Sequence, residues 1–128
     1  MSRLLLDTHA LLWWATDDDR LPPSAREAIV AAEVVYASDV SLWELCVKSS
    51  IGKLRLQPNA ATWFDQQLRL ARFARLALAP RHIAAVENLP LHHRDPFDRL
   101  LICQAFEENL TVVTTDEKFA AYSVPTIW

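Results

Sequence analysis

Short apolar runs alternate with longer amphipathic segments along the whole chain. RLLLD (3–7) predicts a buried strand, and the helical spacing of apolar residues in HALLWWA (9–15) predicts a helix directly after it. VVYAS (34–38) predicts a second strand because it is β-branched and aromatic and then stops at polar residues. DVSLWELCVKSSIGKL (39–54) predicts a helix that ends near Gly52, the only glycine of the sequence.

The rest of the chain repeats this alternation. Ser24 and Glu27 predict a capping box that opens a helix over SAREAIVAAE (24–33). A long amphipathic helix is expected from Asn59 through ATWFDQQLRLARFARL (61–76). Further elements are expected at LALA (76–79, strand), 80–86 (helix), PFDRLLICQAFEEN (96–109, helix), LTVVTT (110–115, strand), DEKFAAY (116–122, helix) and VPTIW (124–128, strand). Such alternation is typical of an α/β fold, a parallel sheet with helices on both faces.

The composition is that of one compact domain over residues 1–128. Hydrophobic residues make up 52% of the chain, which is enough for a core. No apolar run reaches the roughly 18 residues of a membrane span, and the first residues lack the pattern of a signal peptide. We therefore expect a cytoplasmic protein with no membrane segment. Cys46 and Cys103 lie in separate apolar segments and predict buried, reduced thiols.

Four acids lie where strands end or helices begin. Asp7 closes the first strand, Glu44 lies in the first turns of the helix after the second strand, and Asp116 follows LTVVTT. The carboxyl ends of parallel strands meet at one edge of a sheet, and the helices that leave them start there. Asp98, the third residue of its helix, joins the other acids only if that helix starts at the same edge.

Each acid also has a structural interpretation as a helix cap or a first-turn charge. Asp95 and Asp98 could be an N-cap and a first-turn acid, and Ser41 with Glu44 and Thr114 with Glu117 match capping boxes. Asp116 would then be a favourable charge at a helix N-terminus, and Asp7 could cap a helix that Thr8 begins.

Taken together, the acids predict a cation site. Two carboxylates about 4 Å apart repel by about 4 kcal/mol at an effective dielectric of about 20, and a divalent cation removes this cost. No cysteine or histidine has metal-ligand spacing, so the ligands are expected to be oxygens, which favours Mg²⁺ or Mn²⁺ over Zn²⁺. Pro96 at the first helical position makes Asp95 the cap, and Asp98 is left to face the metal.

The net charge of −3 argues against a protein that coats nucleic acid electrostatically. However, removing four cation-binding acids from the 16 leaves 12 against 13 basic residues, so a polyanionic substrate is not excluded. Arg69, Arg72 and Arg75 recur at helical spacing and could follow an RNA backbone, although a solvated helix face is the simpler interpretation.

Four stretches carry a family resemblance: LLLDTHALLWW, ASDVSLWEL, DPFDRLLICQA and LTVVTTDEKF, with VPTIW closing the chain. Together they resemble a PIN domain, and more narrowly a VapC-type toxin of a bacterial toxin–antitoxin pair. The resemblance covers almost the entire chain. It implies a three-layer α/β/α domain with five parallel strands in the order 3-2-1-4-5, in which Asp7 and Asp116 border the crevice where the order reverses.

The resemblance also implies a function. PIN nucleases are Mg²⁺- or Mn²⁺-dependent ribonucleases, and toxins of this type cut structured RNAs, often tRNA. An antitoxin silences them, and the resemblance further implies a homodimer with a groove for an antitoxin helix. The family's site residues carry over onto the acids Asp7, Glu44, Asp98 and Asp116, and its polar residue onto Thr114 or Thr115.

The acids predict a mechanism without a covalent nucleophile. One or two cations would lower the pKa of a water and stabilise charge on the attacking and leaving oxygens of a phosphodiester. Asp7, Asp98 and Asp116 are expected as direct ligands. Glu44 is expected either to bind a second cation or to orient the water.

Several neighbouring residues have weaker expected roles. Thr8 and Arg99 are expected to support the site, and Arg99 would contact phosphate or hold a neighbouring carboxylate. His92, His93 and Arg94 should lie near the acids if the helix after them starts at the same edge, and they could contact phosphate or assist proton transfer, although a solvated loop is the simpler interpretation. The tryptophans are expected mostly in the core, with some left to contact an antitoxin or a second copy, at positions 13, 14, 43 and 63.

Two other functions fit an acidic α/β site. A Mg²⁺-dependent phosphatase or phosphoacceptor domain would use Asp7 as its nucleophile. Phosphatases of that class need an aspartate two residues later, where this chain has His9, and receiver domains need a lysine at the end of a late strand, whereas Lys118 is expected inside a helix. A PIN-fold interaction module without activity would not need all four acids. Both interpretations are weaker than a ribonuclease.

Overall fold

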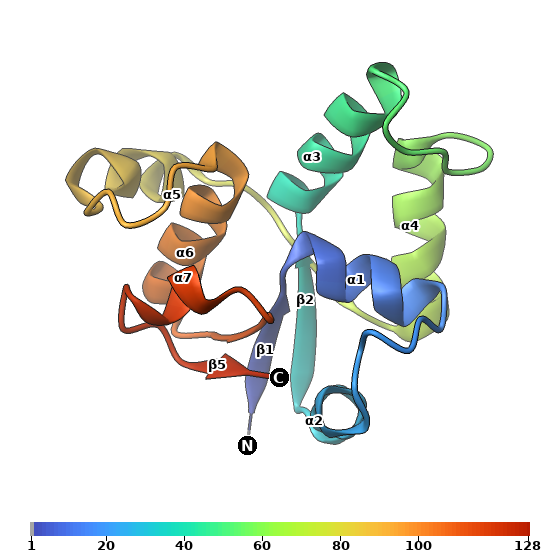
Figure 1. The fold of residues 1–128 in the computed structure, drawn as a ribbon, viewed down its shortest axis with the longest axis horizontal. Coiled ribbons are helices and arrows are strands. Elements are labelled where there is room, and N and C mark those ends of the chain that lie inside the picture. The colour runs from blue at the N-terminus through green and yellow to red at the C-terminus, as the bar shows by residue number, and fades with distance from the viewer. Residues whose placement is uncertain (1) are drawn as a thin grey trace.

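The computed structural model describes residues 2–128 and has a five-stranded parallel sheet between two layers of helices (Figure 1). The strands are β1 (Arg3–Leu6), β2 (Val34–Ser38), β3 (Ala74–Leu76), β4 (Thr111–Val113) and β5 (Thr126–Ile127). Their order is β3-β2-β1-β4-β5, and every pairing is parallel. The predicted α/β/α layers and strand order are therefore confirmed.

Strand β1 divides the hydrophobic core into two halves. Leu4 and Leu6 pack into one half and Leu5 into the other, and all three are fully buried. Neighbouring side chains of a strand point to opposite faces, and both faces of this sheet are covered, which explains why the run is continuously apolar.

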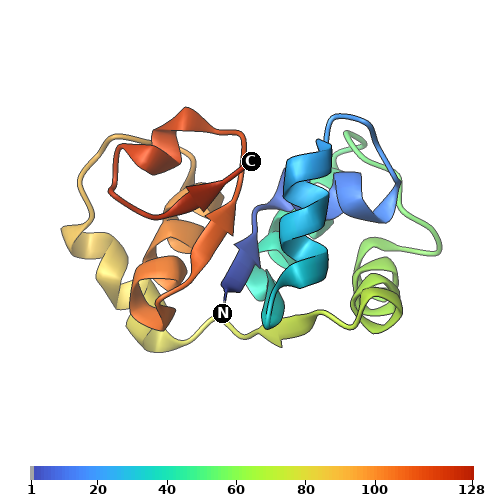
Figure 2. The same cartoon turned by 90° about the horizontal axis from the view of Figure 1, so that it is seen from below.

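The helices are divided between the two faces (Figure 2). One face is covered by α1 (Thr8–Ala15), α2 (Pro23–Ala31) and α4 (Ala60–Ala71), and the other by α5 (Pro80–Ala85), the 3₁₀ turn η1 (Val86–Asn88), α6 (Pro96–Glu108) and α7 (Glu117–Ala120). α3 (Asp39–Ser50) contributes Leu45 to the first half of the core and Val40 to the second. Within residues 2–128, no helix is long and apolar enough to cross a membrane.

Two helix ends follow the expected chemistry, and one does not. α4 begins next to Asn59, as predicted, and the side chain of Asn59 caps it. Gly52, just past α3, has a φ of +77°, a conformation that favours glycine. The capping box of Ser24 and Glu27 is wrong, because α2 begins at Pro23 with no side-chain cap. The N-cap position is occupied by Pro22, whose side chain has no atom that can accept a hydrogen bond.

The boundary between α4 and β3 differs from the prediction. α4 ends at Ala71 because Arg72 takes a left-handed conformation with a φ of 58°. Residues 74–76, rather than 76–79, then pair with β2. Arg69, Arg72 and Arg75 therefore do not share one helix face, and Arg75 forms ion pairs with acids of α3 and α4.

The predicted buried residues are only partly buried. Cys103 is buried and Cys46 is half-buried, and both are free thiols. Trp63 is buried, Trp13 and Trp14 are half-buried, and Trp43 is 49% exposed. The tryptophans thus lie mainly in the core or at its margin, with Trp43 open to solvent.

Candidate active site

The four predicted acids lie at the edge of the sheet where β1, β2 and β4 end. Asp7 follows β1, Glu44 lies in the helix that follows β2, and Asp116 comes shortly after β4. Asp98 joins them because α6 starts at the same edge: a carboxylate oxygen of Asp98 lies within 4.8 Å of one of Asp116. The helix of Asp98 therefore starts at the same edge as the other three acids, which was the condition for Asp98 to join them.

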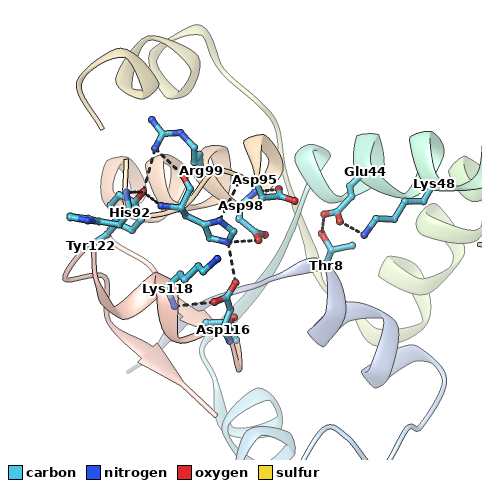
Figure 3. Close-up of polar contacts among 12 residues, drawn as sticks. Thr8, Glu44, Lys48, His92, Asp95, Asp98, Arg99, Asp116, Lys118 and Tyr122 are labelled. Atoms are coloured by element: carbon cyan, nitrogen blue, oxygen red, sulfur yellow. Dashed lines mark hydrogen bonds and ion pairs between the residues drawn. The ribbon is translucent and has the colours of Figure 1, made fainter. Parts of the chain in front are cut away.

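His93 lies between two of these acids. Its Nε2 atom is 2.9 Å from Oδ2 of Asp98 and 3.0 Å from Oδ2 of Asp116. Asp98 and Asp116 point toward one another in Figure 3. The ring is 7% exposed, so the expectation of a solvated loop is wrong for His93, although His92 and Arg94 are exposed. An imidazole nitrogen thus lies beside the carboxylates that were expected to supply oxygen ligands.

Within residues 2–128, Lys48 forms an ion pair with Glu44, but no lysine or arginine forms one with Asp7, Asp98 or Asp116. Burial, followed by the charges of Asp95, Glu44, Asp7 and Asp116, raises the pKa of Asp98 to about 8. Burial also raises the pKa of Asp7, although nearby hydrogen bonds oppose this shift. A divalent cation would stabilise the ionised carboxylates, so the carboxylate oxygens at this edge fit such an ion.

Several acids serve as helix caps as well. Asp7 accepts a hydrogen bond of 2.8 Å from the first turn of α1, and Asp116 accepts one of 2.9 Å from the first turn of α7. Asp95 caps α6 through the backbone N–H of Asp98, at 2.9 Å, as predicted. Asp7 and Asp116 use one oxygen, Oδ1, for the cap, which leaves the other for a further contact. Capping and cation binding are therefore compatible in these two residues.

The capping boxes considered for α3 and α7 are wrong. Ser38, rather than Ser41, caps α3, and Asp116, rather than Thr114, caps α7. The hydroxyl of Thr114 instead accepts a hydrogen bond of 3.0 Å from the backbone of Asp116. These assignments leave the side chains of Ser41 and Glu44 free to face α1.

Glu44 has a different environment from Asp98, because a lysine balances its charge. Lys48, one helical turn later, places Nζ 2.5 Å from Oε2 of Glu44. Thr8 donates a hydrogen bond of 2.7 Å to Oε1, and its hydroxyl lies 2.9 Å from that of Ser41. Figure 3 shows this group to one side of Asp98 and Asp116. Thr8 thus lies where a supporting polar residue was expected.

Thr114 and Thr115 differ in their surroundings. Thr114 is buried, and its side chain acts on Asp7 to lower the pKa of that carboxyl. Thr115 is exposed. Of the two alternatives offered by the sequence, Thr114 is the one that contacts an acid of the site.

Arg99 stabilises a loop instead of a carboxylate. Its guanidinium donates hydrogen bonds to carbonyl oxygens of η1 and the following loop, at Val86, Leu89, Pro90 and His93, and to the hydroxyl of Tyr122. The expectation that Arg99 holds a neighbouring carboxylate is therefore wrong. It lies next to Asp98 in sequence, but its side chain holds the segment that presents His93.

Two residues of the site, Lys48 and His93, were not assigned to it from the sequence. Lys48 lies four residues after Glu44, a spacing that brings opposite charges together on a helix, so this pair could have been found. His93 has no comparable signal. The sequence places it in the loop before Asp95, but it does not tell which of His92 and His93 points inward.

The fold and the site together define a doubly wound α/β protein with carboxylates at the carboxyl edge of its sheet. Residues 4–125 match the PIN domain family, and the chain belongs to this family. It is similar to Ribonuclease VapC22 of Mycobacterium tuberculosis, with 29% identity over 133 residues that cover 100% of both chains.

Solved structures of related proteins share the fold. The chain is similar to a crystal structure of VapBC2 from Rickettsia felis bound to a DNA fragment from their promoter, with a TM-score of 0.70, 17% identity and coverage of 98% of this chain and 97% of that one. It is also similar to FitAcB from Neisseria gonorrhoeae, with a TM-score of 0.62, 23% identity and coverage of 98% and 96%.

Proposed function

We propose that this chain is a Mg²⁺- or Mn²⁺-dependent endoribonuclease and the toxin of a toxin–antitoxin pair. The observation that carries the proposal is the cluster of acids at the carboxyl edge of the sheet of a PIN domain, where burial and the neighbouring acids raise the pKa of Asp98 to about 8. The full-length similarity to a ribonuclease supports RNA as the substrate. Such a protein acts in the cytoplasm, as one domain over residues 1–128.

The four acids have different roles in the proposed reaction. When bound, the cation lowers the pKa of the attacking water and stabilises charge on the phosphodiester oxygens. Asp98 and Asp116 hold it, because their oxygens are near enough to share one ion. Asp7 is the third ligand, and Thr114 favours its ionised form. Glu44, whose charge Lys48 already balances, orients the water.

Cleavage of RNA tests the proposal directly. Purified protein should cut RNA with Mn²⁺ or Mg²⁺ and stop when the metal is chelated. Asp7→Asn and Asp98→Asn should abolish cleavage without unfolding the chain, whereas Asp19→Asn, at an exposed acid away from the site, should not. If Asp7→Asn or Asp98→Asn cut at the parental rate, the assignment of these residues would be wrong.

The same assay separates the proposal from an inactive interaction module. A module would bind its protein partner and leave RNA intact under every metal condition. Mapping the cut ends on total RNA identifies the target, which we expect to be a structured RNA such as tRNA. A random distribution of cuts would argue against a structured target.

We also propose two protein partners, a cognate antitoxin and a second copy of the chain. The similar VapBC2 structure contains the complex of such a pair with promoter DNA. Support for a second copy comes from apolar side chains around a groove of about 420 Å³ between α3, α5 and α6. Trp43, Ile83 and Leu91 line this groove and are 49%, 53% and 69% exposed. Exposed apolar surface of this kind favours association.

The mass of the protein in solution tests the second copy. We expect light scattering to give the mass of a dimer, and Trp43→Glu to give that of a monomer, because a charge in the groove opposes its burial. Val30→Glu is the control, since Val30 is also an exposed apolar residue, with 76% of its surface exposed, but lies on α2. A wild-type chain with the mass of a monomer would contradict the homodimer.

A further inference from the structure

His93 is held in place by contacts to its backbone and to its ring. Its N–H donates a hydrogen bond of 2.8 Å to the hydroxyl of Tyr122, and its carbonyl accepts one of 3.3 Å from Arg99. The ring meets the buried ring of Phe119 edge-on, with 6.2 Å between the centroids. These contacts come from α6, α7 and the turn after α7, so the direction of the imidazole is set by the fold.

The hydrogen bonds of the ring determine which nitrogen carries the proton. The Nδ1 atom of His93 accepts a hydrogen bond of 3.2 Å from the backbone N–H of Asp95. A nitrogen that accepts a hydrogen bond carries no proton, so the proton of the neutral ring lies on Nε2. Nε2 is therefore a donor, and it faces Oδ2 of Asp98 and Oδ2 of Asp116.

We propose that His93 is a positioning residue of the cation site, whose Nε2–H holds the carboxylates of Asp98 and Asp116 close enough to share one ion. This proposal rests on the proposed function, because it assigns a task at the same site. Direct ligation by Nε2 would require the proton on Nδ1, where it would face the N–H of Asp95. Asp95 thus caps α6 and also fixes the tautomer of His93.

A neutral donor suits this position. Two carboxylates that face each other repel, and a shared N–H partly offsets the repulsion. Unlike an ammonium or guanidinium group, it adds no positive charge that would compete with a cation. Glu44 shows the other solution, since Lys48 balances its charge directly. The two arrangements explain why the cation is assigned to Asp98 and Asp116.

Two substitutions of His93 separate positioning from ligation. His93→Leu removes the donor, and His93→Gln keeps an N–H donor at a similar distance from the backbone while removing the imidazole. His92→Leu is the matched control, because His92 is the exposed neighbour whose ring contacts Tyr122. Calorimetry with Mn²⁺ as the probe gives the affinity of each variant. Pulsed electron paramagnetic resonance of the bound Mn²⁺ detects any coordinated imidazole nitrogen.

The proposal gives a distinct result for each variant. His93→Leu should bind Mn²⁺ about 10- to 100-fold more weakly, the usual loss when a residue that orients ligands is removed. His93→Gln should recover most of the affinity, and His92→Leu should bind like the wild type. The Mn²⁺ spectrum of the wild type should show no imidazole nitrogen. Thermal melting without metal checks that each variant is folded, and His93→Gln carries the test if His93→Leu is not.

Three results would overturn the proposal. Wild-type affinity in His93→Leu would show that the donor does not matter. An imidazole nitrogen in the wild-type spectrum that disappears in both His93 variants, with His93→Gln binding as weakly as His93→Leu, would make His93 a ligand. In both cases RNA cleavage by the wild type would leave the proposed function intact. A wild type that binds no Mn²⁺ would overturn the proposed function and this proposal together.

Discussion

Helix α6 carries an acid at each end, and their surroundings act on them in opposite ways. Burial and neighbouring acids raise the pKa of Asp98, in the first turn, to about 8. Hydrogen bonds from Arg81 and His82 lower the pKa of Glu108, the last residue of the helix. The helix dipole would do the reverse, because it favours negative charge at the N-terminus and opposes it at the C-terminus. Local side chains therefore outweigh the dipole at both ends.

The difference between the two ends separates a structural acid from a functional one. Glu108 is held by Arg81 and by the fully buried His82, whose Nε2 lies 3.0 Å from Oε2 of Glu108. The chain thus supplies the partners of this carboxylate. At Asp98 the chain supplies the imidazole of His93 and four further acids, Asp7, Glu44, Asp95 and Asp116. An acid left unbalanced in this way is a candidate for binding an outside cation.

The largest expected effect is on RNA cleavage. Asp98→Asn should lower the cleavage rate by on the order of 1000-fold, because it removes a ligand of the cation that stabilises the transition state. Glu108→Gln, at the other end of the same helix, should leave the rate unchanged. Single-turnover cleavage of a fixed RNA gives both numbers. Equal losses in the two variants would remove the distinction between the two ends.

The next effect is on the pH dependence of stability without metal. The folded-state pKa of Asp98 lies above its ordinary value of 3.8, at about 8. Between these values the folded chain binds more protons than the unfolded chain, so the free energy of unfolding contributed by Asp98 falls as pH rises. Asp98→Asn should therefore stabilise the metal-free protein at pH about 8, by on the order of a few kcal/mol, and have little effect near pH 4.

Thermal melts of the two proteins across this pH range measure the difference. Saturating Mn²⁺ should raise the melting temperature of the wild type at the upper end of the range and leave Asp98→Asn nearly unchanged. A wild type that gained stability with rising pH relative to Asp98→Asn would contradict the raised pKa.

A smaller effect is expected at Arg99, the neighbour of Asp98. Arg99→Ala removes the hydrogen bonds to the carbonyls of η1 and the following loop, so we expect a loss of about 2 kcal/mol in stability. Hydrogen exchange should quicken over residues 86–93. Arg94→Ala, at an exposed arginine of the same loop, is the control. Unchanged exchange in Arg99→Ala would show that the loop does not depend on this side chain.

The smallest effect is expected at Glu108. Glu108→Gln removes charge from hydrogen bonds near the surface and should cost about 1 kcal/mol of stability. Chemical denaturation at neutral pH measures this change. A gain in stability would mean that the contacts with Arg81 and His82 do not favour the folded state, and that Glu108 does not differ from Asp98 as described.

The sequence predicts the sheet and its acidic edge well for a physical reason. Chain direction alone brings the carboxyl ends of parallel strands together, so Asp7 and Asp116 could be placed from their positions after two strands. The end of α4 could not be predicted, because the apolar pattern of the helix continues past Arg72 and nothing in that pattern indicates the left-handed conformation of this residue. The direction of the His93 side chain could not be predicted either. It is determined by Tyr122, which is distant in sequence, and by Arg99, whose contact with the loop was not expected.

Binding of Mn²⁺ to the wild type, Asp98→Asn and Glu108→Gln, measured by calorimetry at neutral pH, tests most directly whether the acidic edge is a cation site. The wild type and Glu108→Gln should bind with equal affinity and release protons, because the ion displaces the proton of Asp98. Asp98→Asn should bind about 100-fold more weakly or not at all. Binding by Asp98→Asn at wild-type affinity would contradict the account.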